Sequence, residues 1–297
     1  MRRAYVVINP VAGGSEPDAI EGALEVHFRR PAWSYECYRT RGDERLPEVI
    51  GSALPRDFDL FVAAGGDGTV SGVAGALVRS DKPLGVLPVG TGNALAQDLG
   101  IPQELDRAAA LLAGEHAYRA IDAFSVEGRF FILNVSAGLS ARMMDETSVQ
   151  EKRLVGALAY VWSGAEELAD LDLHEFEVTV DGQRSRLRAV DVLALNSGVM
   201  GFATASWGSE NQLDDGLAEV YALQPRRPLD LVQFAWRRLL QRPVQERRVR
   251  QWYARQRVAI DSESPLPVQG DGDVFGTTPI EIRLVPHAVR VVVPTGV

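Results

Sequence analysis

Residues 60–69 read Leu-Phe-Val-Ala-Ala-Gly-Gly-Asp-Gly-Thr, an apolar run that passes directly into a glycine-rich turn. A second such turn, Pro88-Val89-Gly90-Thr91-Gly92-Asn93, follows the apolar run Leu84–Leu87. Each turn lies where a buried strand is expected to end and a helix to begin, so its backbone N–H groups can hold phosphate. Glycine permits positive φ angles and close approach of a ligand to the backbone. The pair therefore predicts a site for a nucleotide polyphosphate.

Asp67 stands inside the first of these turns. A carboxylate has no obvious task there unless a cation lies nearby, and Mg²⁺ is the hard cation that accompanies phosphates. We therefore expect a metal ion beside the nucleotide. The alternative is that both turns are ordinary strand-to-helix loops, which suits one such turn better than two in the same unit.

The first part of the chain alternates expected strands and helices, which predicts a parallel sheet with helices on both faces. Ligands of such sheets bind outside the carboxyl ends of the strands, where both glycine turns lie. The expected strands are Tyr5–Ile8, Trp33–Tyr38, Leu60–Ala64 and Leu84–Leu87, and the expected helices are Pro17–Arg29, Asp43–Leu54, Val70–Val78, Asn93–Leu99 and Glu104–Ala113.

The pattern changes near residue 118 to short strands with few helices, which favours a sandwich or a barrel. Val180-Asp181-Gly182-Gln183 is a strong hairpin signal. The expected strands are Tyr118–Val126, Arg129–Ser136, Glu175–Val180, Gln183–Leu195, Ala218–Leu223, Arg257–Ile260, Pro279–Leu284 and Arg290–Val293, interrupted by helices over Val149–Leu171 and Asp230–Gln241. We predict an α/β protein with an N-terminal three-layer parallel-sheet nucleotide-binding domain (1–122) and a C-terminal antiparallel β-sandwich domain (123–297).

Composition narrows the class of protein. The chain has 297 residues and a formal net charge of −9, which argues against nucleic-acid binding. The lone Cys37 excludes an intrachain disulfide, and no apolar run is long enough to span a bilayer. Ten arginines nevertheless gather between Pro225 and Arg257, with Trp252 and Tyr253 among them. This segment suits an anionic membrane surface, although a helix with a solvated basic face explains it as well.

The two turns occur together with Asn9-Pro10-Val11-Ala12-Gly13-Gly14, Asp214-Asp215-Gly216 and Asp271-Gly272-Asp273. In this order and with similar spacing, these motifs resemble the diacylglycerol kinase catalytic-domain family, which includes bacterial lipid kinases and the sphingosine and ceramide kinases. The resemblance covers nearly the whole chain. It implies transfer of the γ-phosphate of ATP, with Mg²⁺, to a hydroxyl of a diacylglycerol-like or sphingoid lipid. In the family the last strand often returns to the first domain, and the sequence leaves this open here.

Phosphoryl transfer requires groups that position the phosphates and neutralise their charge. We expect backbone groups of the glycines and the hydroxyls of the threonines in both turns to bind ATP, and the resemblance adds pocket-lining residues. The expected nucleotide-binding residues are Asn9, Thr40, Gly65, Gly66, Gly68, Thr69, Gly90, Thr91 and Asn93. Thr40 is equally well explained as a plain loop residue.

Three acidic residues are the expected catalytic set. Asp67 orients Mg²⁺ through water, and the resemblance implies that Asp122 joins this metal–water network. Asp271 is the candidate general base, since a carboxylate can take the proton of a lipid hydroxyl. The alternatives are a surface aspartate on an edge strand for Asp122 and a plain hairpin turn for Asp271, because Asp-Gly also signals a hairpin.

The resemblance also implies a structural Mg²⁺ site. Gln212, Asp214 and Asp215 match a loop that binds this ion in some bacterial members, and paired carboxylates beside a glycine suit a hard cation. Asp273 stands where the family usually has Glu and is counted with the metal residues. The alternative is a turn with solvated acids.

The chain departs from the family pattern at two places. Ala12-Gly13-Gly14 lacks the usual Ser and Lys, and Ala94 and Gln97 replace an Asp and a basic residue of many bacterial diacylglycerol kinases. Two alternatives therefore stay open: a soluble-substrate kinase of the NAD kinase type, and a nucleotide-binding regulatory protein without transfer activity. We expect a cytoplasmic protein that meets its lipid at the inner membrane surface, and a homodimer is left open.

Overall fold

The computed structural model describes residues 1–12, 17–29, 31–42, 44–146, 172–196, 199–200, 203–206, 212–227, 230 and 248–296. The chain divides into two compact units, unit 1 with Met1–Ala123 and Pro286–Val297, and unit 2 with Phe124–Val285. The helix expected over Val149–Leu171 lies outside the described residues, as does the one over Asp230–Gln241 apart from Asp230.

Unit 1 is built on a parallel sheet in the order β2-β1-β3-β4, and the end of β18 pairs in parallel with β4 through Val291 and Leu84. Its strands are β1 (Arg2–Ile8), β2 (Trp33–Arg39), β3 (Leu60–Gly65), β4 (Leu84–Pro88), the first part of β5 (Ala117–Val126) and the last part of β18 (Ile280–Val293). Its helices are α1 (Pro17–His27), α2 (Leu46–Ala53), the 3₁₀ turn η1 (Leu54–Arg56), α3 (Asp67–Leu77), α4 (Ala94–Asp98) and α5 (Leu105–Ala113).

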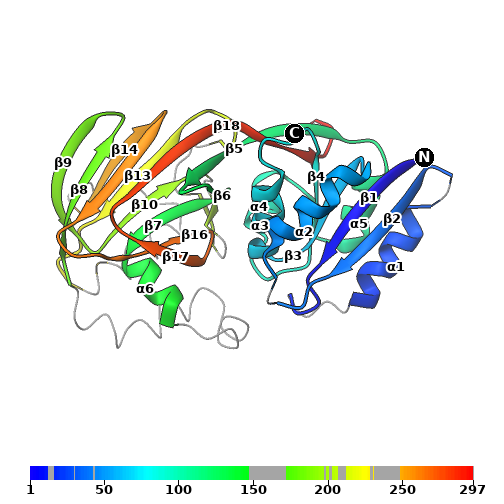
Figure 1. Ribbon diagram of the computed structural model, residues 1–297, viewed down its shortest axis with the longest axis horizontal. Helices are drawn as coiled ribbons and strands as arrows, with labels where there is room; N and C mark the ends of the chain where they lie inside the picture. Colours follow the sequence, from blue (N-terminus) through cyan, green and yellow to red (C-terminus); the bar gives the residue numbers. More distant parts are fainter. Residues whose placement is uncertain are drawn as a thin grey trace. The chain divides into compact units, whose positions relative to one another are not determined.

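Helices cover both faces of this sheet (Figure 1). Helix α1 contacts α5, and α2 contacts α3. Ile20 of α1 and Leu112 of α5 share one apolar cluster with Val6 and Val62, while the neighbouring strand residues point to the other face, as successive strand residues must. The predicted three-layer, parallel-sheet fold of the N-terminal part is confirmed.

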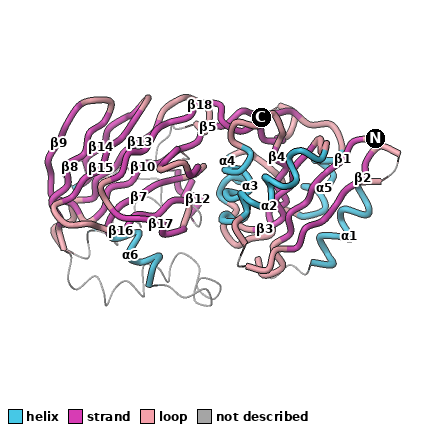
Figure 2. Tube along the Cα trace, in the orientation of Figure 1, coloured by secondary structure: helices cyan, strands magenta, loops and turns pink. Residues whose placement is uncertain are grey.

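Unit 2 is a β-sandwich, and strands dominate it (Figure 2). One sheet is antiparallel in the order β14-β13-β10-β7-β16-β17, and the other side is formed by β18, β15, β8 and β9, with β6 paired to β5. The strands are β6 (Arg129–Phe131), β7 (Asn134–Gly138), β8 (His174–Val180), β9 (Gln183–Ala189), β10 (Asp191–Leu195), β13 (Ala218–Leu223), β14 (Val249–Ala254), β15 (Arg257–Ser262), β16 (Pro267–Gly270) and β17 (Asp273–Thr277), with the pair β11 (Val199–Met200) and β12 (Ala203–Ser206) and the helix α6 (Leu139–Glu146).

The two sheets of unit 2 share one apolar core. Val135 and Val192 of the six-stranded sheet lie in the same buried cluster as Val178, Ile260 and Ile282 of the opposite sheet. Alternation of apolar and polar residues along each strand therefore packs one face of each sheet inward. The predicted antiparallel sandwich is confirmed, and the hairpin at Asp181 joins β8 to β9 as expected.

Some predicted strand limits were wrong because tertiary contacts interrupt or extend the strands. The strand expected over Arg129–Ser136 is broken between β6 and β7, since the backbone N–H groups of Ile132 and Leu133 donate to the Asp271 carboxylate. The strand expected over Gln183–Leu195 splits at Val190, whose N–H donates to the Leu223 carbonyl, so that β9 and β10 join different sheets.

The structure also contains elements that the sequence did not predict. Strands β14, β16 and β17 and helix α6 were not expected, and the two separate strands expected between Pro279 and Val293 form the single strand β18. The left-handed backbone at His287 (φ 51°) lies within β18, and the sequence around it gives no sign that pairing continues past it.

Candidate functional site

The loops that follow four neighbouring strands of unit 1 meet at one edge of its sheet. Because β2, β1, β3 and β4 are parallel neighbours, their carboxyl ends lie side by side. Thr40 follows β2, Asn9 follows β1, and the two glycine turns follow β3 and β4. The sheet thus brings all the predicted nucleotide-binding residues to the same edge, where ligands of such sheets bind.

Asn9 connects its loop to the first glycine turn. Its Nδ2 donates to Thr69 Oγ1 over 3.0 Å, and its Oδ1 accepts the Val11 N–H. Thr69 is buried, so its hydroxyl supports the turn from inside. Gly65 has no room for a side chain, since an added Cβ would lie 2.5 Å from Thr69. Glycine is required here by packing within the protein.

The two glycine turns touch each other. A Cβ on Gly90 would lie 2.3 Å from the Gly66 Cα, which no real contact allows. Asp67 adds a polar link, because its Oδ1 accepts the backbone N–H of Ala94 over 2.6 Å at the start of α4. This contact gives Asp67 the structural task that the sequence did not reveal, and a nearby cation is no longer needed to explain its position.

Asn93 closes the second turn. It has left-handed backbone (φ 52°), its Oδ1 accepts the Gly90 N–H over 2.9 Å, and its Nδ2 donates to the Gly90 carbonyl over 2.9 Å. Thr91, at the tip of this turn, is exposed. The side chain of Asn93 thus holds the shape of the turn, while Thr91 is accessible to a ligand.

The residues at this edge fit a polyphosphate. Helix α3 starts at Asp67, and the N–H groups of a first helical turn attract anions. Gly68 in that turn is exposed, and among the described residues no atom beyond its chain neighbours and the nearby backbone of its own helix lies within 4 Å of where its Cβ would stand. This exposed backbone suits the approach of a phosphate.

Asp122 is fully buried in β5, which rules out the alternative of a surface residue. Its Oδ1 accepts the backbone N–H of His287 over 2.8 Å, and the His287 ring lies 4.0 Å away. This contact ties β5 to the left-handed kink of β18. A buried carboxylate requires such partners, because its desolvation is costly.

Asp271 begins the two-residue turn between β16 and β17, with φ 50°, and Gly272 follows with φ 91°. The hairpin alternative is therefore realised. The Asp271 carboxylate also accepts three consecutive backbone N–H groups, from Ile132, Leu133 and Asn134, over 2.7, 2.8 and 2.9 Å. These bonds fix the carboxylate in one orientation, and its role as a base stays a prediction.

A second turn repeats this geometry. Asp181 and Gly182 have φ angles of 47° and 91°, and the Asp181 carboxylate accepts the N–H groups of Arg255, Gln256 and Arg257. Burial alone would raise the pKa of Asp181, but these hydrogen bonds lower it below its ordinary value. This arrangement therefore also occurs in a turn to which no catalytic role is assigned. Asp181 can serve as a control for substitutions of Asp271.

The predicted metal residues form a turn of their own. The Asp215 carboxylate accepts the N–H groups of Gln212 and Leu217 over 3.2 and 2.8 Å. Asp214 is half-buried, and Asp273 is exposed in β17. Within the described residues, no three His, Cys, Asp or Glu side chains lie close enough together to hold a metal ion. Mg²⁺ needs only one or two carboxylates besides water, so this site also stays a prediction.

Sequence reasoning missed a buried polar cluster in unit 2. Ser136, Asp191 and Gln269 lie on one face of the six-stranded sheet with exposures of 0, 2 and 3%. Burial raises the pKa of Asp191 to about 7, and the hydrogen bonds from Ser140 offset this only in part. The signal was present in the sequence, since Asp191 stands alone between apolar residues of its strand.

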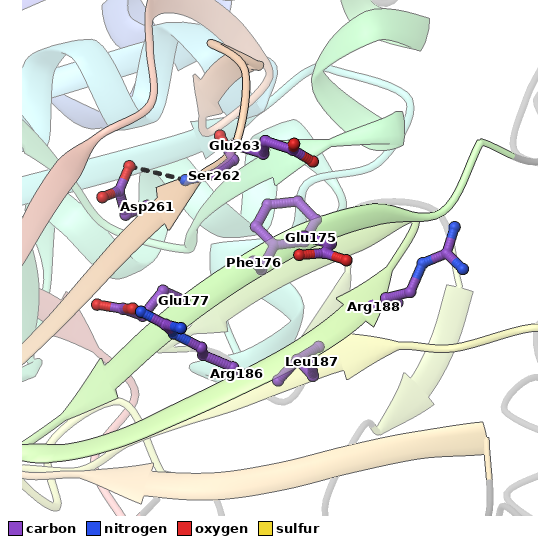
Figure 3. Close-up of a pocket in the computed structure, with 9 residues that line it drawn as sticks. All are labelled: Glu175, Phe176, Glu177, Arg186, Leu187, Arg188, Asp261, Ser262 and Glu263. Atoms are coloured by element: carbon purple, nitrogen blue, oxygen red, sulfur yellow. Dashed lines mark hydrogen bonds and ion pairs between the residues drawn. The ribbon is translucent and has the colours of Figure 1, made fainter.

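A cavity of about 430 Å³ lies elsewhere in unit 2, on β8, β9 and β15 (Figure 3). It contains none of the predicted site residues. Its basic side chains lie on β9 and its acidic side chains on β8 and at the end of β15, and Glu177 pairs with Arg186 over 2.9 Å. Its lining consists of Glu175, Phe176, Glu177, Arg186, Leu187, Arg188, Asp261, Ser262 and Glu263.

The arginine-rich segment is described only in part, because residues 231–247 lie outside the described ranges. Arg248 forms an ion pair with Asp230, and Arg250 lies over the Trp252 ring at 5.0 Å. Among the helices described, none is both long and apolar enough to cross a membrane.

Comparison with known proteins agrees with this architecture. The diacylglycerol kinase catalytic domain model matches residues 3–126, and the YegS C-terminal NAD kinase beta sandwich-like domain model matches residues 133–293. A diacylglycerol kinase of Bacillus subtilis is 28% identical over 99% of this chain and 97% of its own. A protein of Pseudomonas savastanoi pv. phaseolicola named as a YegS-like lipid kinase is 32% identical over 66% of this chain and 64% of its own.

Solved structures show the same fold. A crystal structure of a diacylglycerol kinase from Bacillus anthracis str. Sterne has a TM-score of 0.74 at 19% identity, covering 100% of this chain and 98% of its own. A second structure from that strain reaches a TM-score of 0.83 at 21% identity with the same coverage. With both domain models matched in sequence along nearly the whole chain, the protein belongs to the diacylglycerol kinase family of lipid kinases.

Proposed function

We propose that this lipid kinase transfers the γ-phosphate of ATP, in the presence of Mg²⁺, to a hydroxyl group of a membrane lipid. The observation that carries the proposal is the contact between the two glycine turns at the carboxyl ends of β3 and β4. Exposed backbone at Gly68, the N-terminus of α3 and the accessible Thr91 together suit a polyphosphate.

The proposed roles follow from what phosphoryl transfer requires. Gly66, Gly68 and Gly90 offer backbone to the phosphates, and Thr91 offers a hydroxyl. Mg²⁺, when bound, would neutralise charge on the transferring phosphoryl group, and Asp67 is the carboxylate that the first glycine turn offers to it. Asp271 accepts the proton of the lipid hydroxyl. Three N–H groups fix the orientation of its carboxylate, and orientation matters more than basicity in this reaction.

We further propose that the arginine-rich segment contacts an anionic membrane surface, where the lipid substrate resides. Arg250 stacked on Trp252 combines a cation with an aromatic ring, as interfacial segments do. Binding to vesicles of anionic lipid should weaken steeply as salt rises, because attraction between exposed charges is screened. Absent or salt-insensitive binding would count against this contact.

The reaction is tested by transfer of radiolabelled phosphate from Mg-ATP to mixed vesicles containing diacylglycerol, monoacylglycerol, sphingosine and ceramide, with NAD in solution. A labelled lipid supports the proposal and identifies the substrate. Label on NAD alone would assign a soluble-substrate kinase. ATP binding without any label would assign a regulatory protein.

The role of Asp271 is tested by the pair Asp271→Asn and Asp181→Asn. Both substitutions remove an acceptor from the same kind of turn, so both carry a similar structural cost. Loss of a general base lowers kcat by roughly 100-fold or more. We expect this loss for Asp271→Asn with ATP binding retained, and near wild-type kcat for Asp181→Asn. Equal kcat in the two variants would refute the assignment of Asp271 as base.

A further inference from the structure

The Gln269 side chain holds both sides of the Asp271 turn. Its Nε2 donates to Asn134 Oδ1 over 2.8 Å and to Ser136 Oγ over 2.5 Å. Its Oε1 accepts the backbone N–H of Gly272 over 2.8 Å. Gly272 belongs to the turn, and Asn134 belongs to the segment whose N–H groups bind the Asp271 carboxylate. One buried amide therefore links the turn to the backbone that orients the carboxylate.

Gln269 is itself anchored from the interior of unit 2. Ser136 lies opposite it in the β16–β7 register, and Ser136 Oγ is 2.7 Å from Ser140 Oγ at the start of α6. The Ser140 N–H donates to Asp191 Oδ2 over 3.0 Å. Hydrogen bonds thus run from Asp191 through Ser140 and Ser136 to Gln269. Because Ser136, Asp191 and Gln269 are buried, water does not compete for these bonds.

The backbone of the turn needs such support. Asp271 and Gly272 both have left-handed φ angles, and Asp271 donates its own N–H to the Asn134 carbonyl over 3.1 Å. Removing the Gln269 amide leaves Gly272 N–H and Asn134 Oδ1 without these partners, which favours a shift of the turn toward water. At the matching position before Asp181 stands Thr179, which carries no amide.

We propose that Gln269 is a positioning residue that sets the orientation of the Asp271 carboxylate for phosphoryl transfer, and that Ser136, Ser140 and Asp191 hold Gln269 in place. The inference rests on the proposed function, in which Asp271 is the base. A shift of about 1 Å in a catalytic group can reduce the rate on the order of 100-fold. Such a shift need not weaken the binding of the substrate.

The test compares Gln269→Met with Tyr221→Phe. Methionine has a similar volume and cannot make the three hydrogen bonds. Tyr221 is buried in the same sheet on β13, three strands from β16. Its O–H donates to Glu219 Oε2 over 2.5 Å and accepts from Gln251 Nε2 over 3.0 Å, so Tyr221→Phe removes hydrogen bonds in which neither Gln269 nor Asp271 takes part. With Mg-ATP and the lipid vesicles, we expect kcat of Gln269→Met to fall roughly 10- to 100-fold at unchanged KM for ATP. Tyr221→Phe should keep kcat within about twofold.

Amide hydrogen exchange supplies a second measurement that needs no activity. In Gln269→Met the amides of Ile132–Asn134 and Gly272 should exchange faster than in the wild-type protein, whereas in Tyr221→Phe they should not. If Gln269→Met does not fold, Ser136→Ala replaces it. That variant removes one acceptor of the Gln269 amide and should lower kcat roughly 3- to 30-fold.

The outcomes separate this inference from the proposed function. A wild-type kcat in Gln269→Met would overturn the inference, and so would a wild-type kcat in Ser136→Ala if Gln269→Met does not fold. The assignment of Asp271 as base is tested separately by Asp271→Asn. An equal loss of kcat in Tyr221→Phe would also overturn it, because the effect would then be general destabilisation. If Asp271→Asn turns over as fast as Asp181→Asn, the base assignment fails and the positioning role fails with it.

Discussion

Asp191→Asn should stabilise the protein at neutral pH but much less at acidic pH. Asp191 is 2% exposed, and its Oδ1 has no hydrogen-bond partner in the described part of the chain. Burial raises its pKa from 3.8 to about 7 despite hydrogen bonds from Ser140 and Val192. The neutral amide of asparagine resembles the protonated carboxyl in shape, and it does not titrate.

The magnitude follows from proton linkage. Between pH 3.8 and about 7 the folded protein keeps the Asp191 proton while the unfolded chain has lost it, so the free energy of unfolding falls as pH rises through this window. Each pH unit changes it by about 1.36 kcal/mol while the folded protein keeps the proton, and the slope is half of that at about pH 7, where the folded group is half titrated, so the step from pH 5 to pH 7 gives about 2.3 kcal/mol. About one pH unit higher this contribution becomes constant.

The assay is reversible urea unfolding of the wild-type protein and the variant at pH 5, 6, 7 and 8. The variant should gain about 2.3 kcal/mol over the wild type between pH 5 and pH 7 and less than about 0.5 kcal/mol more at pH 8. Asp181→Asn is the control. The lowered pKa of Asp181 places its pH dependence below pH 3.8, so its effect should not vary from pH 5 to pH 8. A difference between wild type and Asp191→Asn that is constant from pH 5 to pH 8 would refute the reasoning.

Three substitutions probe the glycine turns of unit 1. Gly90→Ala should weaken both stability and ATP binding, because its methyl group would lie 2.3 Å from the Gly66 Cα; a thermal shift equal to wild type with and without ATP would contradict this contact. Gly68→Ala has room for its methyl and should keep stability, so weaker ATP binding by calorimetry would report a direct approach of phosphate to this backbone. Asp67→Ala should cost about 1 kcal/mol of stability without Mg²⁺ present, as loss of a helix cap does, and an unchanged urea midpoint would argue against its bond to Ala94.

The sequence was a good guide where structure depends on neighbours in the chain. The alternation of Leu60–Ala64 and Leu84–Leu87 with helical segments predicted β3, β4 and their helices, because periodicity reflects which faces are buried. The Asp181-Gly182 turn was predicted for a local reason, since this dipeptide adopts the required positive φ angles.

Strands without such local signals were missed. Val249–Ala254 contains charged and aromatic residues and becomes β14 because it pairs with β13 across the sheet. Most of its side chains are exposed or only partly buried, so the segment needs no alternation of apolar and polar residues and shows none. Strand pairing between residues distant along the chain decides such segments, and one sequence does not display the partner.

By itself, the sequence determined the fold class, the two glycine turns and the family, because short motifs and apolar periodicity are local properties. Only the tertiary structure decided which groups the acidic side chains bind within the protein. Asp67 meets Ala94, Asp122 meets His287 and Asp271 meets Ile132–Asn134, and each partner is a backbone N–H far away along the chain. Every residue except proline carries that same donor, so no side-chain pattern marks which one will be reached. The fold selects it by bringing the strands together.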